Sequence, residues 1–257
     1  MKTIVINNQK GGVGKTMLAA HLAWFLAEDD PTSRILVIDF DPQGNVSHTL
    51  SEHGNGAKAS QLLFGPDLAL ESRPGITLLA ADPALFAAEQ QAEAAMVSIE
   101  GRFPELKAHF DFVVIDTPPT WGVRNMAAMM VADALVSPIE LEEYALLGVR
   151  ALLNQRRHVE SKARNGRALH FLGLLPSRFQ SNSPKQRQHL QDLIKGVGSN
   201  MMFPGVITQR QGYSEALSEK VPVWKIKKTA AQEAGREIRP ILSVIKERTL
   251  ALSEAAA

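Results

Sequence analysis

A glycine-rich run, Lys10-Gly-Gly-Val-Gly-Lys15-Thr16, limits the folds open to this chain more than any other feature of the sequence. It follows the apolar, β-rich run 3–7 and precedes residues 17–26, where apolar positions recur at helical spacing. We therefore expect a strand, a loop and a helix in that order. Such a loop binds phosphate, because glycines let successive N–H groups face one anion and the positive end of the helix points to the same place.

The residues of this loop have separate predicted tasks. Lys15 brings a positive charge to the β- and γ-phosphates, and Thr16 offers a hydroxyl ligand for Mg²⁺. The usual pattern has its first Gly where this chain has Gln9, so the loop is the variant K-G-G-x-G-K-[ST], distinguished by Lys10. The predicted nucleotide-binding residues of the loop are Gly11, Gly12, Val13, Gly14, Lys15, Thr16 and Met17.

Two further motifs place carboxylates at the ends of apolar strands. The heptapeptide Asp39-Phe-Asp41-Pro-Gln-Gly-Asn45 follows one apolar run, and Asp116-Thr-Pro-Pro119 follows another. Open α/β sheets bind ligands at the carboxyl ends of their strands, so these aspartates are expected to meet the phosphate loop. A carboxylate there can face the attacking water or hold a magnesium-bound water. An Asx-type turn at the strand end is the alternative for Asp39 taken alone.

Strands alternate with helical stretches along the chain, which predicts the fold class. We expect an α/β fold with a doubly wound, mostly parallel β-sheet flanked by helices on both faces, as in P-loop NTPases. The chain of 257 residues is expected to form a single domain, with a surface excursion at 51–75 and a frayed tail at about 250–257. The expected strands are 3–7, 34–39, 76–79, 111–116, 134–138 and 168–175, and the clearest helices are 143–161, 184–196 and 229–249.

Charge is distributed unevenly although the net charge is only +1. Residues 1–149 carry 9 Lys and Arg against 19 Asp and Glu, whereas residues 150–257 carry 19 against 8. A basic half indicates a polyanionic partner, and the alternative is a set of solvated helix faces. The chain has no cysteine, which excludes disulfides, Fe–S clusters and thiolate metal sites and fits a reducing cytoplasm.

The three motifs together resemble the ParA/MinD group of P-loop ATPases, and within it the ParA-type plasmid and chromosome partition proteins. The resemblance covers residue 2 to about residue 248. It implies ATP and Mg²⁺ as cofactors, with Lys10, Lys15 and Asp41 as catalytic residues and Thr16, Asp39 and Asp116 near the metal. By resemblance, Lys10 reaches across an ATP-bound homodimer to the partner's phosphates, and Asp41 positions or activates the water. Pro176 and Arg178, with the loop 204–209, correspond by position to the adenine site.

The resemblance also implies partners. ParA-type proteins bind double-stranded DNA non-specifically when ATP-bound, and a ParB-like centromere-binding adaptor stimulates their weak basal ATPase. Segments 137–142 and 221–229 are similar to partition ATPases of broad-host-range plasmids. We expect a cytoplasmic, nucleoid-associated protein without membrane binding. Candidate DNA-binding residues are Lys185, Arg187, Arg210, Lys225, Lys227 and Lys228.

Other functions of this group of ATPases are weighed against the partition role. A MinD-like protein that cycles on membranes needs a basic amphipathic C-terminal helix, which the ending Leu-Ala-Leu-Ser-Glu-Ala-Ala-Ala does not resemble. The first expected strand begins at residue 3, so no N-terminal helix-turn-helix and no signal peptide are expected. A ParA-like protein that positions another cellular cargo stays open as the alternative.

Overall fold

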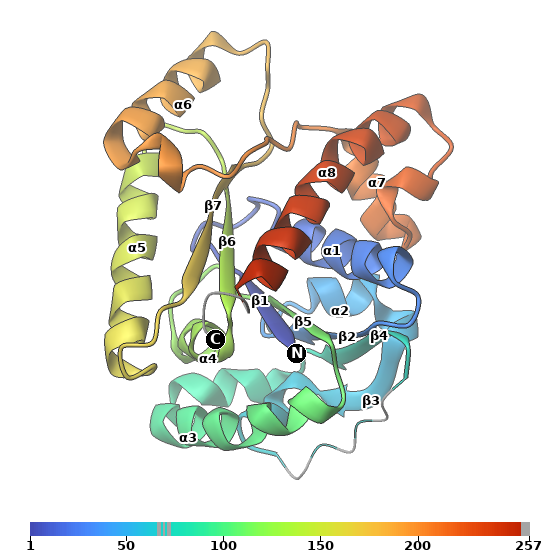
Figure 1. Ribbon diagram of the computed structural model, residues 1–257, viewed down its shortest axis with the longest axis vertical. Coiled ribbons are helices and arrows are strands. Elements are labelled where there is room, and N and C mark those ends of the chain that lie inside the picture. Colours follow the sequence, from blue (N-terminus) through green and yellow to red (C-terminus); the bar gives the residue numbers. More distant parts are fainter. Residues whose placement is uncertain (66–67, 69, 71–72, 253–257) are drawn as a thin grey trace.

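The computed structural model describes residues 1–65, 68, 70 and 73–252. In this part of the chain, seven strands form one sheet in the order β3-β4-β2-β5-β1-β6-β7, and all neighbouring strands run parallel (Figure 1). The strands are β1 (Lys2–Ile6), β2 (Arg34–Asp39), β3 (Gly54–Lys58), β4 (Gly75–Ala80), β5 (Phe112–Asp116), β6 (Ala134–Ile139) and β7 (His170–Pro176).

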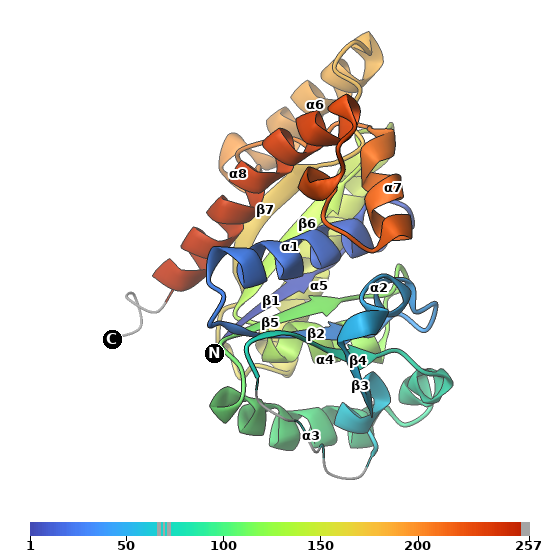
Figure 2. The same cartoon turned by 90° about the vertical axis from the view of Figure 1, so that its right-hand side faces the viewer.

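Helices cover both faces of the sheet (Figure 2). Side chains alternate along β2, so that Ile35 and Val37 pack against one group of helices while Leu36 and Ile38 pack against the other. One face is covered by α1 (Lys15–Asp29), α2 (Asn45–Thr49), α7 (Gln211–Glu219) and α8 (Thr229–Ala251). The other is covered by α3 (Ala92–Arg102), α4 (Val123–Val131), α5 (Ala145–Lys162) and α6 (Pro184–Val197). The predicted doubly wound parallel sheet is therefore confirmed.

Short 3-10 helices lie in the connections. They are η1 (Ser51–His53), η2 (Ala59–Leu62), η3 (Pro83–Glu89), η4 (Phe103–Ala108), η5 (Ser199–Met201) and η6 (Val223–Lys225). The expected surface excursion at 51–75 contains η1, η2 and the mostly exposed edge strand β3. At the C-terminus, α8 continues to Ala251 and Leu252 is the last described residue, so residues 253–257 of the expected frayed tail lie outside the described residues. The single-domain assignment stays a prediction.

Strand register brings the predicted site residues to one edge of the sheet. β5 lies between β2 and β1, with Asp116 paired to Asp39 on one side and to Ile6 on the other. The glycine-rich loop leaves β1 at the same edge and leads into α1. The three motifs found in the sequence therefore meet because their strands are neighbours, although about 100 residues separate the first from the last.

Candidate nucleotide-binding site

The glycine-rich loop adopts a backbone that other residues would strain. Gly12 has φ 76° and Gly14 has φ 93°, both in the left-handed region. α1 begins at Lys15, and no side-chain hydrogen bond caps its N-terminus. The N–H groups of its first turn are therefore available to an anion at the positive end of the helix.

Lys15 lies inside the loop. Its residue is only 7% exposed, and its Nζ donates a hydrogen bond to the carbonyl oxygen of Lys10 at 3.0 Å. Burial lowers the pKa of the Lys15 ammonium, while the nearby carboxyls of Asp116 and Asp41 act in the opposite direction. A phosphate group in the loop would supply the negative charge that favours the ammonium form.

Thr16 and Asp116 place two oxygen atoms side by side, either of which could bind a cation. The Thr16 hydroxyl donates to Oδ2 of Asp116 at 2.7 Å. Burial raises the pKa of the Asp116 carboxyl to about 8, and the neighbouring Asp39 adds to this shift. A divalent cation here would relieve the cost of the buried carboxylate, and hard oxygen ligands suit Mg²⁺. Among the described residues, no group of three or more His, Cys, Asp and Glu is placed to hold a metal ion.

Asp39 and Asp41 lie on one loop but make different contacts. Oδ2 of Asp39 accepts hydrogen bonds from the backbone N–H of Ser47 at 2.9 Å and its hydroxyl at 2.6 Å, and Oδ1 accepts from the N–H of Asp41 at 3.1 Å. Burial raises the pKa of Asp39 to about 6, although these hydrogen bonds act to lower it. Asp39 thus supports the loop that presents Asp41, and its predicted place near the metal stays a prediction.

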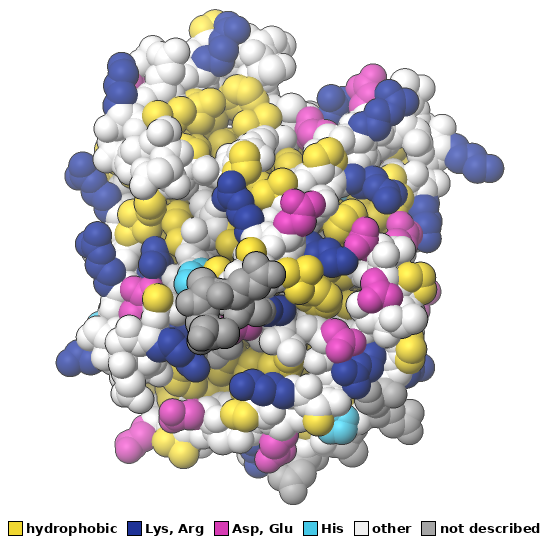
Figure 3. All heavy atoms as spheres, viewed as in Figure 1, with side chains coloured by type: hydrophobic (Ala, Val, Ile, Leu, Met, Phe, Trp, Pro, Cys, Tyr) yellow, Lys and Arg dark blue, Asp and Glu magenta, His cyan; other side chains and the backbone are white. Residues whose placement is uncertain are grey.

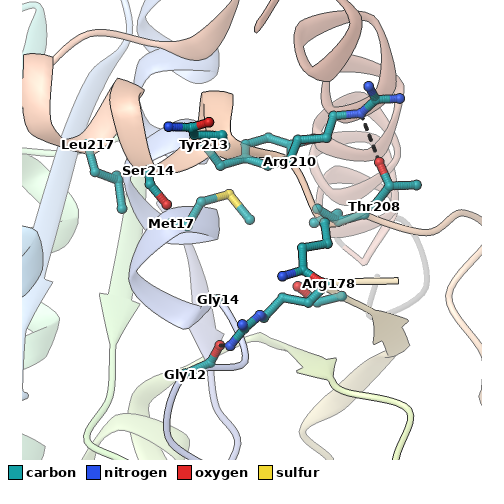
Figure 4. Close-up of a pocket in the computed structure, with 13 residues that line it drawn as sticks. Gly12, Gly14, Met17, Arg178, Thr208, Arg210, Tyr213, Ser214 and Leu217 are labelled. Atoms are coloured by element: carbon teal, nitrogen blue, oxygen red, sulfur yellow. Dashed lines mark hydrogen bonds between the residues drawn. The ribbon is translucent and has the colours of Figure 1, made fainter. Parts of the chain in front are cut away.

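Two cavities adjoin the loop. One of about 550 Å³ is lined by Lys15, Thr16 and Asp41 together with Gln43 and other residues of the loops. The other, of about 460 Å³, begins at Gly12, Gly14 and Met17 and extends toward α7, as Figure 4 shows. Loop glycines and Met17 line both cavities, so one elongated ligand can lie against the loop from both sides. Val13, in the same loop, is buried.

The second cavity is lined by parts of the two segments that the sequence analysis assigned to adenine binding. Pro176 ends β7, and its carbonyl oxygen accepts from the N–H of Ile207 at 2.8 Å; the cavity wall is formed by Ser177 and Arg178. Nη1 of Arg178 donates to the carbonyl oxygen of Gly12 at 3.3 Å. The sequence analysis missed Tyr213 and the other lining residues of α7, because no motif marks that helix.

Lys10 points away from the buried part of the loop. Its side chain is 42% exposed, and its Nζ forms ion pairs with Glu140, at 3.0 Å, and with Glu142. Partial burial lowers the pKa of Lys10, but its bonds to Glu142 and Glu140 outweigh burial and hold that pKa above its usual value. The two lysines of the loop therefore face different surroundings.

Comparison with known proteins links this site to one family. The model of a family described as an AAA domain matches residues 1–168. The sequence is 38% identical to Protein IncC from Escherichia coli over 95% of this chain and 69% of the relative. It is 31% identical to the chromosome-partitioning ATPase Soj from Thermus thermophilus over 85% of each chain. The fold is similar to that of a plasmid partition protein from Borrelia burgdorferi, with a TM-score of 0.69 at 20% identity, over 96% of this chain and 98% of that one.

The chain belongs to the ParA-type partition ATPases. The resemblance drawn from the three motifs is thereby confirmed. No helix in the described ranges of this ParA-type ATPase has both the length and the apolar character needed to cross a membrane.

The predicted DNA-binding residues of this ParA-type ATPase are spread over several elements. Lys185 and Arg187 lie on α6, and Lys227 follows η6. Carboxylates of the same chain pair with the other three: Arg210 with Glu233 and Glu237, Lys225 with Glu28, and Lys228 with Glu215. On the face shown in Figure 3, Lys and Arg side chains gather over α5 and α6 and again near α7 and α8. DNA binding by these six residues stays a prediction.

Proposed function

We propose that this ParA-type ATPase forms an ATP-dependent homodimer that binds double-stranded DNA non-specifically and releases it after hydrolysis. ATP would place its phosphates against the glycine-rich loop and its base in the cavity between Arg178 and α7. Thr16 and Asp116 would hold Mg²⁺, which neutralises part of the phosphate charge when bound.

The separate places of Lys10 and Lys15 carry the proposal. Lys15 is buried inside the loop and serves the phosphates bound by its own chain. Lys10 is exposed on the outer side of the same loop, where a second copy can approach. In the proposed dimer, Lys10 leaves Glu140 and Glu142 and reaches the phosphates of the partner. ATP is then part of the interface, so the dimer ends when the γ-phosphate is lost.

Asp41 is the residue proposed to position the attacking water. It is buried to 8% exposure, lines the cavity beside Thr16, and is fixed by the N–H of Gln43, which donates to its Oδ1 at 3.1 Å. We propose slow basal hydrolysis that a ParB-like adaptor and DNA accelerate. The basic residues of α6 to α8 would contact DNA phosphates, so binding would weaken steeply with salt.

Light scattering after size exclusion tests the dimer. With ATP and Mg²⁺ the protein is expected to elute as a dimer, and with ADP or without nucleotide as a monomer. Lys10→Ala is expected to stay monomeric in ATP while still binding a fluorescent ATP analogue. The matched control is Lys107→Ala, which removes an exposed lysine of η4. A Lys10→Ala protein that dimerises as the control does would overturn this role of Lys10.

A further inference from the structure

The segment 81–89, called here the bridge segment, runs from the end of β4 through η3 and contacts α2 and α4, the helices that follow the loops after Asp39 and Asp116. At its start, the N–H of Ala81 donates to Oγ of Ser47 at 2.8 Å. The same hydroxyl donates to Oδ2 of Asp39 at 2.6 Å. Two hydrogen bonds through the Ser47 hydroxyl therefore connect the bridge segment to Asp39, the aspartate that supports the loop carrying Asp41.

The other end of the bridge segment contacts the start of α4, at the point where the loop 117–122 that follows Asp116 ends. Glu89 accepts a hydrogen bond from the N–H of Val123 at 3.0 Å and one from Nε of Arg124 at 3.2 Å. Val123 is the first residue of α4, so the Glu89 carboxylate lies at the positive end of that helix. Glu89 thus fixes the point at which the loop 117–122 ends.

The Glu89 carboxylate lies very close to the backbone of Gly122, the last residue of the loop 117–122. A Cβ atom at Gly122 would lie 2.5 Å from both carboxylate oxygens of Glu89. The backbone of Gly122 is extended, with φ 179°, so its conformation does not require glycine. Space for Glu89 is the reason a side chain does not fit there.

Arg124 makes the position of Glu89 costly to change. The arginine is only 6% exposed, and its recorded ion pair is the one with Glu89. Its Nη1 has no hydrogen-bond partner among the described residues. Moving Glu89 away would leave a buried guanidinium without a carboxylate. On its other side, the Arg124 guanidinium lies 5.7 Å from the ring centre of Phe86, which also belongs to the bridge segment.

We propose that Glu89 is a positioning residue for ATP hydrolysis: it sets the loop 117–122, and through the bridge segment it joins this loop to the one that carries Asp41. Within the loop, the Thr117 hydroxyl bonds the carbonyl oxygen of Ile6 at 2.8 Å, and Nδ2 of Asn125 bonds that of Pro118 at 3.3 Å. Glu89 supplies the anchor at the far end. This inference rests on the proposed nucleotide-driven switch.

Two substitutions test the role of Glu89 from opposite sides of the contact. Glu89→Gln removes the charge while keeping an acceptor for Val123, and Gly122→Ala pushes the carboxylate away. The matched control is Glu93→Gln, an exposed carboxylate in the first turn of α3. Both test variants are expected to lower kcat roughly 10- to 100-fold, with KM for ATP changed much less, because misplaced catalytic groups cost rates of that order.

A second readout separates positioning from simple stabilisation. Trp121 lies inside the loop, so the change in its fluorescence when ATP and Mg²⁺ are added reports the loop, with Trp121→Phe giving the background from Trp24 and Trp224. Both test variants are expected to lose most of this change. A purely structural cap would lower the thermal unfolding temperature, but the folded protein would keep the kcat and the Trp121 response of the Glu93→Gln control. That outcome in both variants would overturn the inference.

The failure of the proposed function looks different. If the oligomeric state and the DNA retention of the wild-type protein do not depend on nucleotide, the proposed switch is wrong. If the wild-type protein does respond to nucleotide, and Glu89→Gln and Gly122→Ala respond in the same way, only the proposed role of Glu89 is wrong. If Glu89→Gln does not fold, Gly122→Ala decides the question, because it leaves the charges of Glu89 and Arg124 in place.

Discussion

The ion pairs of Lys10 predict how dimerisation can be made easier. In the single chain, Glu140 and Glu142 hold the lysine that the proposed dimer needs. Glu142→Gln removes one of these carboxylates, so less attraction is lost when Lys10 moves to the partner's phosphates. An exposed ion pair contributes about 0.2–1 kcal/mol. Two lysines move per dimer, so the variant is expected to favour the dimer by about 0.4–2 kcal/mol, roughly 2- to 30-fold in its dissociation constant.

Sedimentation velocity with AMPPNP and Mg²⁺ measures this constant without hydrolysis. The matched control is Glu143→Gln, the next residue, for which the described structure records no ion pair. The advantage of Glu142→Gln should shrink as salt is raised, because exposed charges are screened. Dimerisation that is unchanged or weaker in Glu142→Gln, relative to Glu143→Gln, would refute the reasoning that Lys10 must leave its own carboxylates.

Three further predictions concern stability and hydrolysis. Burial lowers the pKa of His21 to about 4 from its usual 6.5, so the unfolded chain takes up the proton first. The free energy of unfolding, measured in urea, should therefore fall by about 3 kcal/mol as the pH drops from above 6.5 toward 4. The variant His21→Gln should lack this loss. Arg164 donates from a buried site to five carbonyl oxygens, among them those of Met129 and Ala132. Arg164→Met should therefore lower the free energy of unfolding by about 3 kcal/mol or more in the same assay. A loss no larger than that of Arg167→Gln would contradict this. Asp41→Ala should abolish phosphate release while fluorescent ATP still binds, and normal release would disprove its catalytic role.

The sheet, and the meeting of the three motifs at the candidate phosphate site, were predictable because their signals are local. Buried parallel strands such as β2 and β5 are continuous apolar runs, and each ends in an aspartate of the candidate site, Asp39 or Asp116. The edge strand β3 gave no such signal, since its sequence Gly54–Lys58 is polar and mostly exposed. Glu89 was missed for another reason: its partners Val123 and Arg124 lie 34 and 35 residues away, and no spacing rule connects them.

The charge count of the C-terminal half was a weaker guide than the motifs. It predicted a basic surface, but Lys225 is neutralised by Glu28 at 2.7 Å, and Glu28 belongs to the acidic half of the chain. Lys228 pairs with Glu215 at 3.2 Å and Arg210 with Glu233 at 2.7 Å. A count along the sequence cannot include ion pairs made by folding. Lys185, Arg187 and Lys227 are therefore the candidates to replace first in DNA-binding experiments.

Retention of the protein on a non-specific DNA duplex tests the central claim most directly. It is measured at one salt concentration with ATP and Mg²⁺, with ADP and Mg²⁺, and without nucleotide. The proposed switch predicts retention with ATP that is strong relative to the other two states, and loss of that retention in Lys10→Ala. Equal retention in all three states would contradict the account.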